Sequence, residues 1–430
     1  MKKINIITLG CSKNVVDSER MALQLKHNGY LVQHNSNESA HIVIINTCGF
    51  INDAKQEAID TILQYAQAKQ QGAVEQLFVV GCLSQRYADV LRTEIPEVDE
   101  YFGTNSIEQV LQKLNGACRS ALLSERLTST PQHYAYLKIA EGCNWHCSYC
   151  AIPLIRGKFV STPLPQLLHE AEFLAQQGVK ELILVAQDLT YYGLDIYQKR
   201  ELARLLQSLS RIDGIQWLRL HYAYPSAFPL DVLDEMQHNP KICHYLDIPF
   251  QHISDNVLKK MRREHSQKDI LALIADLRQR VPDLALRTTL LVGHPGEAEN
   301  DFQELLQFVT RTRFERLGVF AYSHEEGTYA ATHFVDNIPE NEKQRRLNEV
   351  MALQSKISNE LNTGKIGNVC KVIIDRQEGD FFVARSQYDS PEVDGEILID
   401  AAIPLKIGDF YNVKITDSNE YDLFATLLAD

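Results

Sequence analysis

The sequence predicts an α/β protein with three parts: an N-terminal parallel βα sheet, a complete or partial βα barrel, and a small C-terminal β-barrel. Three observations lead to this prediction. Short β-rich runs alternate with helical patterns over residues 1–115, the same alternation resumes near Tyr134, and the residues after Thr363 contain only short strands and turns. Alternating strands and helices are typical of a parallel sheet, whereas several short strands with frequent turns are typical of a small barrel.

The N-terminal and middle parts share this alternation. Residues 1–115 contain the apolar runs INIITLG, HIVIINT and LFVVG, separated by the helical patterns DSERMALQLKHNG and DAKQEAIDTILQYAQAKQQG. After a polar stretch at 124–133, six further strands are predicted in YLKIAEG, ELILVAQD, WLRLHYAYP, HYLDIPFQH, LALRTTLLVGHPGE and RLGVFAYSHEEG. Six strands in this order, with helices between several of them, suggest a barrel.

The C-terminal part begins after a charged helix predicted at 340–362. Five short strands follow, in CKVIIDR, FFVARS, GEILID, FYNVKITD and YDLFATLL. From Thr363 to Asp430 there are 6 Lys and Arg and 13 Asp and Glu, which give this part a formal charge of −7. Binding to RNA needs clustered basic residues, so the charge favours a basic partner.

Composition narrows the class of protein. The chain has 430 residues, 45% of them apolar, and a formal net charge of −13, which argues against broad attraction to nucleic acid or to an anionic membrane. The N-terminal apolar run is too short for a signal peptide, and no run approaches the length of a membrane span. We therefore expect a cytoplasmic protein whose nine cysteines are reduced; Cys118, Cys243 and Cys370 show no partner spacing and are read as structural.

Three cysteines, Cys143, Cys147 and Cys150, lie within eight residues in the stretch EGCNWHCSYCAIP. They follow a predicted strand ending at Ala140, so they belong to a βα loop at the face where barrel active sites form. A four-iron four-sulfur cluster usually takes four cysteines, and three leave one iron open for a ligand. The alternatives are a zinc site with His146 as fourth ligand, or simple burial, which requires no fixed spacing.

A second set of cysteines stands at the ends of three apolar runs in the N-terminal part. The carboxyl ends of parallel strands meet at one crevice, so residues far apart in sequence can come together there. One such cysteine alone is more often a small core residue, but three at equivalent strand ends favour a shared ligand. A neighbouring glycine in each case would let the backbone approach a bulky inorganic ligand. The cysteines are Cys11, Cys48 and Cys82, and the glycines are Gly10, Gly49 and Gly81.

The spacing Cys-x3-Cys-x2-Cys, with Tyr149 before the last cysteine, resembles the radical S-adenosylmethionine (SAM) superfamily. With the second cysteine set and the terminal β-barrel, the whole chain resembles the methylthiotransferases. This resemblance implies a methylthiotransferase N-terminal domain at 1–117, a radical SAM core with a partial (β/α)6 TIM-like barrel at 129–362, and a TRAM domain at 363–430. It also implies S-adenosylmethionine and two 4Fe-4S clusters, held by Cys143, Cys147 and Cys150 and by Cys11, Cys48 and Cys82.

The family chemistry implies a different task for each cluster. The first cleaves S-adenosylmethionine to a 5′-deoxyadenosyl radical that removes hydrogen from an unactivated carbon, and the second supplies a methylthio group. At predicted strand ends, Gln187, Asp188, Gly293 and Glu297 could hold S-adenosylmethionine, with Tyr149 near its adenine. Ordinary loop polarity or packing is an equally good interpretation of each of these residues.

Four stretches resemble the methylthiotransferases that modify an aspartate β-carbon of small-subunit ribosomal protein S12: TLGCSKNVVDSE, VAQDLTYYGLDI, LRLHYAYPS and YLDIPFQHISDNVLKKMRR. His294 and the stretch RGKFVSTP depart from the family pattern. We therefore expect ribosomal protein S12 and an electron donor protein as partners, with no membrane and no tRNA substrate. The alternatives are a methylthiotransferase acting on position 2 of a tRNA adenosine, and a non-catalytic ribosome- or RNA-binding protein with structural metals.

Overall fold

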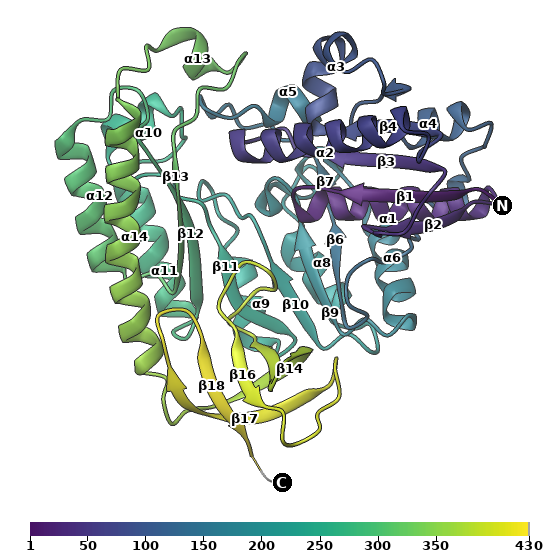
Figure 1. Ribbon diagram of the computed structural model, residues 1–430. Coiled ribbons are helices and arrows are strands. Elements are labelled where there is room, and N and C mark those ends of the chain that lie inside the picture. The colour runs from purple at the N-terminus through teal and green to yellow at the C-terminus, as the bar shows by residue number, and fades with distance from the viewer. Residues whose placement is uncertain (429–430) are drawn as a thin grey trace. The chain divides into compact units, whose positions relative to one another are not determined.

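The computed structural model describes residues 1–428 (Figure 1). The chain forms two compact units. Unit 1 contains Met1–Thr130, Tyr136–Trp145 and Ala151–Phe173, and unit 2 contains Pro131–Ala135, His146–Cys150 and the chain from Leu174 onward. None of the helices within residues 1–428 is long and apolar enough to cross a membrane.

Unit 1 is built on a five-stranded parallel sheet. Its strands are β1 (Lys3–Thr8), β2 (Leu31–His34), β3 (Ile42–Thr47), β4 (Gln76–Gly81) and β5 (Glu100–Tyr101), in the order β2-β1-β3-β4-β5. Every neighbouring pair in this sheet is parallel, as the sequence predicted. The sequence analysis named β1, β3 and β4 but not β2 and β5, the two strands at the sheet edges.

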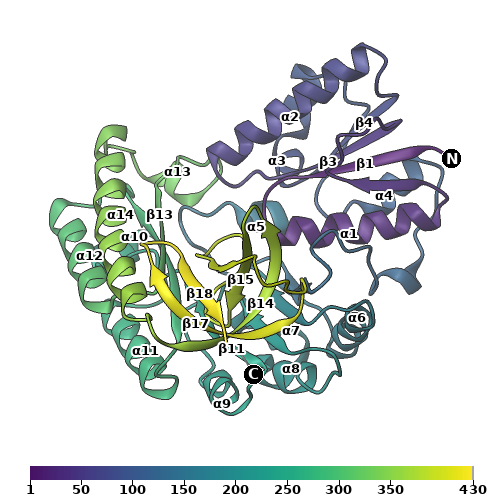
Figure 2. The same cartoon turned by 60° about the horizontal axis from the view of Figure 1, so that its bottom comes forward.

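Helices cover both faces of this sheet, as Figure 2 shows for α1 and α2. Successive residues of β3 point to opposite faces, so Ile42 and Ile44 pack with α1 and α4, whereas Val43 and Ile45 pack with α2 and α3. These helices are α1 (Ser12–His27), α2 (Asn52–Gln70), α3 (Cys82–Glu94) and α4 (Ile107–Lys113). Unit 1 also holds η1 (Ser120–Leu122), β7 (Ala140–Glu141), β8 (Val160–Ser161), α5 (Ile152–Arg156) and most of α6 (Leu164–Gln176).

The second parallel sheet has six strands in the order β13-β12-β11-β10-β9-β6. Its strands belong to unit 2, except that residues Tyr136–Lys138 of β6 belong to unit 1. The sheet is open, so of the two predicted forms the partial barrel is the one observed. The strands are β6 (Tyr134–Lys138), β9 (Glu181–Val185), β10 (Trp217–Leu220), β11 (Ile242–Asp247), β12 (Ala285–Val292) and β13 (Arg316–Ala321). Between or after them lie η2 (Leu189–Tyr191), α7 (Leu194–Tyr197), α8 (Leu202–Leu209), α9 (Asp231–His238), α10 (Asp255–Lys260), α11 (Gln267–Arg280), α12 (Glu299–Thr312) and α13 (Tyr329–His333).

The long helix α14 (Glu340–Thr363) leads into a closed five-stranded barrel, the yellow strands in Figure 1. Its order is β14-β15-β16-β18-β17, and its interior is filled by alternate side chains such as Val372, Ile374 and Ile415. The five strands are β14 (Val369–Glu378), β15 (Phe381–Ser386), β16 (Ile397–Asp400), β17 (Phe410–Ser418) and β18 (Leu423–Leu427). All five predicted C-terminal strands are thus confirmed, together with the barrel they form.

Buried ion pairs within unit 2 join this barrel to the parallel sheet. Glu181 on β9 accepts hydrogen bonds from Arg219 on β10, at 2.6 Å, and from Arg385 on β15, at 2.8 Å. Arg385 also pairs with Asp375 on β14, which contacts His133 at 2.7 Å. Burial favours the neutral form of Glu181, but the two arginines outweigh it and lower the pKa of its carboxyl group. This network fixes how the sheet and the barrel pack.

We expect Glu181→Gln to lower the free energy of unfolding by about 3–5 kcal/mol, because the buried guanidinium group of Arg219 loses its carboxylate partner and that of Arg385 loses one of its two. The measurement is equilibrium chemical denaturation. The control is Glu360→Gln, which breaks an exposed pair with Arg313 and should change stability by no more than about 0.5 kcal/mol. Equal effects of the two substitutions would contradict this account of the network.

Candidate functional site

Cys11, Cys48 and Cys82 follow β1, β3 and β4, which are direct neighbours in the sheet of unit 1. The register pairs Thr8 with Asn46 and Thr47 with Gly81, so the three strands end at nearly the same level. In the strand order β2-β1-β3-β4-β5, the second strand is added on one side of β1 and the third strand on the other side. Open parallel sheets bind ligands at such a switch in strand order. The structure therefore brings the three cysteines together at one edge of the sheet.

The glycines beside these cysteines are sites where protein atoms approach the backbone closely. Gly10 has φ +91°, and a Cβ there would lie 2.7 Å from the Cβ of Cys48. Gly81 has φ +100°, and its Cβ would lie 2.5 Å from the amide oxygen of Asn46 and 2.7 Å from the backbone oxygen of Thr47. Protein atoms occupy the space that a side chain would need at these two positions. These glycines therefore allow the strand ends themselves to come close together.

Asn14 and Arg156 organise the surroundings of these cysteines. Asn14, buried on α1, donates from Nδ2 to the backbone oxygens of Leu9 (2.9 Å) and Thr47 (3.1 Å). Its Oδ1 accepts a 2.5 Å hydrogen bond from Arg156, and lies 3.9 Å from the sulfur of Cys82. Arg156 also pairs with Glu141 at 2.9 Å. One amide side chain thus links two strand ends, a cysteine and a buried guanidinium group.

The thiols of this set differ in acidity. Burial alone would raise the pKa of Cys11, but Lys13, Arg156 and backbone N–H groups at the start of α1 outweigh burial and lower it. Burial is the largest influence on Cys82 and raises its pKa to about 11. A thiolate at a helix N-terminus is stabilised in this way, and the thiolate is the form that binds metal. Of the three thiols in this set, Cys11 therefore forms the metal-binding thiolate most readily.

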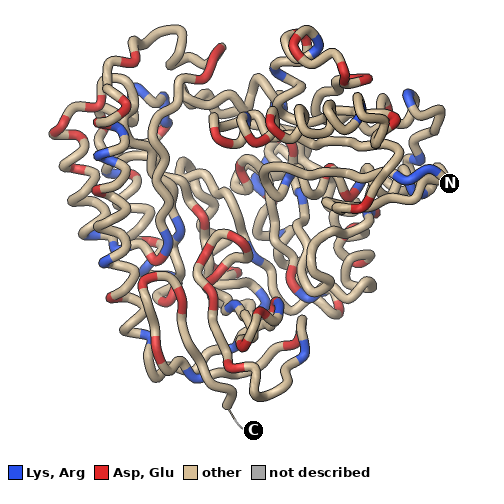
Figure 3. The backbone as a smooth tube through the Cα atoms, viewed as in Figure 1, with Lys and Arg blue, Asp and Glu red and all other residues tan. Residues whose placement is uncertain are grey.

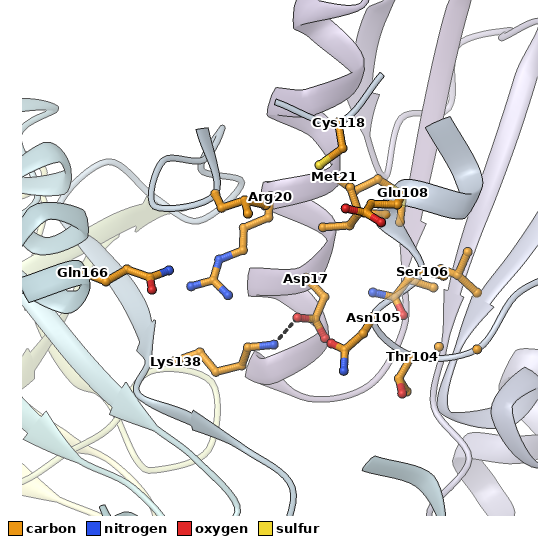
Figure 4. A pocket seen from close by; sticks show the side chains of 16 residues that line it. Asp17, Arg20, Met21, Thr104, Asn105, Ser106, Glu108, Cys118, Lys138 and Gln166 are labelled. Atoms are coloured by element: carbon orange, nitrogen blue, oxygen red, sulfur yellow. Dashed lines mark hydrogen bonds and ion pairs between the residues drawn. The ribbon is translucent and has the colours of Figure 1, made fainter. Parts of the chain in front are cut away.

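A cavity of about 330 Å³ within unit 1 reaches Asn46 and Gly81 (Figure 4). Figure 4 shows Asp17 and Arg20 on α1 facing Lys138 and Gln166, with the loop from Thr104 to Ser106 on the other side. Asp17 is paired with Lys138, and Arg20 with Glu170. The cations of this cavity are thus already neutralised by protein carboxylates.

The loop that carries the other three cysteines spans both units. Cys143 belongs to unit 1, whereas Cys147 and Cys150 belong to unit 2. The strand that the sequence extended to Ala140 ends at Lys138, and the short β7 follows it. In unit 2, the backbone N–H of Ser148 donates to the oxygen of Met261 at 2.8 Å, and its oxygen accepts from the N–H of Ala330 at 2.7 Å. The segment from Cys147 to Cys150 is thereby fixed on both sides.

Two side chains that the sequence did not indicate contact the sulfur of Cys147. Arg263, which follows α10, donates to the sulfur of Cys147 at 3.5 Å, and the hydroxyl of Tyr224 lies 4.0 Å from the same sulfur. A signal was present in the paired arginines of KKMRREH, but sequence alone does not reveal which of the two points inward. Asn14 and Arg156 were also missed, because their contact joins residues far apart in the sequence.

The five residues predicted to hold S-adenosylmethionine all lie in unit 2, at the ends of two strands or in the cysteine loop. Asp188, after β9, accepts hydrogen bonds from Thr190 and from the backbone N–H of Tyr224, and half-buried Gln187 precedes it. Glu297, after β12, accepts from the N–H of Gly293 at 2.6 Å and pairs with Arg346 at 2.9 Å. Both carboxylates shape their own loops.

Tyr149 lies near the second of these loops through His294. The rings of Tyr149 and His294 meet edge to face, 6.5 Å apart, and His294 also packs against Tyr322 and Phe334. His294 contacts the hydroxyl of Ser148 at 3.1 Å, and burial lowers its pKa to about 4. This histidine, a departure from the family pattern, thus occupies an aromatic cluster and adds a hydrogen bond to the cysteine loop.

The cysteines of unit 1 supply thiols, and thiolates are the ligands that iron–sulfur clusters take from proteins. Three convergent strand-end thiols with cationic neighbours are a donor set suited to iron and sulfide.

Three family models match the chain. They are the uncharacterized protein family UPF0004 over residues 3–103, the radical SAM superfamily over residues 137–309, and the TRAM domain over residues 366–428. The solved structure of the radical S-adenosylmethionine methyltransferase TsrM from Kitasatospora setae, with cobalamin and a [4Fe-4S] cluster bound, is similar with a TM-score of 0.56. It is 14% identical, and the match covers 77% of this chain and 74% of TsrM, a likeness that concerns the fold alone.

Curated relatives match at much higher identity. The ribosomal protein uS12 methylthiotransferase RimO of Christiangramia forsetii is 55% identical over 98% of this chain and 93% of its own length. The proteins of the same name from Cytophaga hutchinsonii and Bacteroides thetaiotaomicron are 53% and 52% identical, each over 99% of this chain and 98% of its own length.

We expect Gly81→Ala to destabilise unit 1 more than Gly72→Ala. Both glycines have positive φ, but no atom lies within 4 Å of the added methyl group at Gly72. Gly72→Ala should therefore cost about 1–2 kcal/mol from backbone strain alone, and Gly81→Ala about 2 kcal/mol more because rigid backbone blocks the methyl group. Hydrogen exchange of the β1, β3 and β4 amides measures the difference, and equal protection in the two variants would contradict it.

Proposed function

Because the chain belongs to the family of ribosomal protein uS12 methylthiotransferases, we propose that it adds a methylthio group to the β-carbon of an aspartate in ribosomal protein S12. The observation that carries this proposal is identity above 50% to enzymes of that name over nearly the whole length of both chains. The alternative within the family, a tRNA adenosine as substrate, is one outcome of the experiment below.

We propose that Cys143, Cys147 and Cys150 hold one 4Fe-4S cluster and that Cys11, Cys48 and Cys82 hold the other. When bound, the two clusters and S-adenosylmethionine supply the 5′-deoxyadenosyl radical and the methylthio group. The residues of the chain bind and orient these groups. Burial of the loops after β9 and β12 keeps water away from the radical, and the cationic side chains beside Cys11 stabilise its thiolate.

The predicted contacts to S-adenosylmethionine remain part of the proposal. Tyr149, Gln187, Asp188, Gly293 and Glu297 line loops at the carboxyl ends of β9 and β12 or the cysteine loop, which is where parallel sheets bind ligands. Since the carboxylates of Asp188 and Glu297 already accept backbone hydrogen bonds, we propose that they act by holding loop backbone toward the cofactor. We keep the predicted domain bounds, 1–117, 129–362 and 363–430.

We further propose that the protein acts in the cytoplasm, receives electrons from a donor protein and does not take tRNA as substrate. The exclusion of tRNA is supported by the composition of the C-terminal part, in which Asp and Glu outnumber Lys and Arg by 13 to 6 from Thr363 onward. Figure 3 shows acidic residues on several strands and turns of the C-terminal barrel. An acidic composition of this kind favours a basic ribosomal protein over the phosphates of RNA.

The protein purified without oxygen should contain about eight irons per chain, four for each cluster. Replacing Cys11, Cys48 and Cys82 together by alanine should leave about four, because the other cluster keeps its ligands. Iron and acid-labile sulfide are the quantities to measure. An unchanged iron content in this variant, or zinc in place of iron, would refute the assignment of the second cluster.

Cys147→Ala should abolish the release of 5′-deoxyadenosine on reduction with S-adenosylmethionine, whereas replacement of Cys118 by alanine should leave it unchanged. Release of 5′-deoxyadenosine that depends on Cys147 would show an enzyme, whereas no release from the unmodified protein would indicate a binding protein with structural metals.

Mass spectrometry of ribosomal protein S12 and of tRNA nucleosides, from cells with and without the gene, identifies the substrate. We expect the methylthio group to disappear from S12. Its loss from tRNA alone would replace our proposal with the alternative.

A further inference from the structure

Arg263 is a buried cation whose surroundings provide almost no negative charge. Only 9% of the surface of Arg263 is exposed to solvent. One guanidinium nitrogen donates to the sulfur of Cys147 at 3.5 Å, and another donates to the backbone oxygen of Pro249 at 2.6 Å. The guanidinium carbon lies 4.3 Å from the ring centre of Tyr224. All of these residues belong to unit 2.

Other buried arginines of the chain have carboxylate partners. Arg219 pairs with Glu181, and Arg346 pairs with Glu297. Within the part of the chain that the structure describes, no Asp or Glu pairs with Arg263, and its Nε atom is buried without a hydrogen-bond partner. Burying a guanidinium ion without a counter-charge is costly. A cysteine that ligates a metal does so as a thiolate, so a metal-bound Cys147 would supply the negative charge that Arg263 lacks.

Backbone hydrogen bonds fix this contact. The N–H of Ser148 donates to the oxygen of Met261, which ties the residue after Cys147 to the end of α10. At Arg262 the chain adopts φ +55°, and the N–H of Arg263 returns to the oxygen of Leu258 at 2.9 Å. This left-handed helix ending turns Arg263 inward while Arg262 stays exposed, with its guanidinium carbon 4.4 Å from the ring centre of Tyr329.

We propose that Arg263 is a positioning residue that acts through Cys147 and raises the reduction potential of the cluster held by Cys143, Cys147 and Cys150. The proposal rests on the proposed function, which places a cluster on these cysteines. Uptake of an electron makes the cluster one unit more negative. A fixed cation and an N–H donor at a ligand sulfur stabilise this more negative state, and the low dielectric of a buried site strengthens the effect.

The test compares reduction of a single cluster in three full-length chains. The parent carries alanine at Cys11, Cys48 and Cys82, so that one cluster is observed, and the other two chains add Arg263→Gln or Arg262→Gln. The fraction reduced is read from the electron paramagnetic resonance signal at fixed potentials. Where half of the parent is reduced, we expect Arg263→Gln to show a reduced-to-oxidised ratio about tenfold lower, a shift of about 59 mV to more negative potential.

Arg262→Gln removes the same charge one residue away and should change the ratio by less than twofold. If Arg263→Gln loses its iron, Arg263→Lys decides the question. Lysine keeps the charge but not the forked donor, so we expect a smaller drop in the same direction. A ratio within twofold of the parent in the iron-loaded Arg263 variant would overturn this proposal alone. A parent without a reducible cluster would overturn the proposed function together with it.

Discussion

Parallel strands have their carboxyl ends at a common edge of the sheet, and the candidate functional residues of both units depend on that constraint. In unit 1 it gathers Cys11, Cys48 and Cys82 from positions far apart in sequence, because β1, β3 and β4 are neighbours. In unit 2 it places the loops after β9 and β12 at the same edge of the second sheet. An antiparallel arrangement would send alternate strand ends to opposite edges and separate these residues.

The sequence was sufficient for the fold because the hydrophobic pattern of each element agrees with its position. Runs such as IVII in β3 are apolar on both faces, as a sheet covered by helices requires, and the alternation of buried and exposed residues in β17 suits a barrel with one buried face. The strands β2 and β5 were missed because they are short edge strands. Leu31 of β2 is half exposed, so this strand lacks the apolar signal of a buried strand.

The candidate site was predictable only in part. Cysteine spacing and strand-end position indicated all six cysteines, but not the side chains around them. Arg156 and Arg263 reach their partners across more than a hundred residues of sequence, from Asn14 in one case and from Cys147 in the other. Such long-range partners follow from the three-dimensional packing and leave no periodic pattern. The glycines beside the first set of cysteines were interpreted correctly as sites of close approach, but the approaching atoms belong to the protein.

The two backbone hydrogen bonds of Ser148 have a consequence for the segment between Cys147 and Cys150. Small zinc domains gain their shape from the metal, since the free chain has no other reason to hold its ligands together. Here the N–H and C=O of Ser148 are held by Met261 and Ala330, so contacts within the protein fix the segment between Cys147 and Cys150. A segment fixed in this way loses little conformational entropy when it takes a ligand. Hydrogen bonds of the protein itself therefore set the shape of this segment.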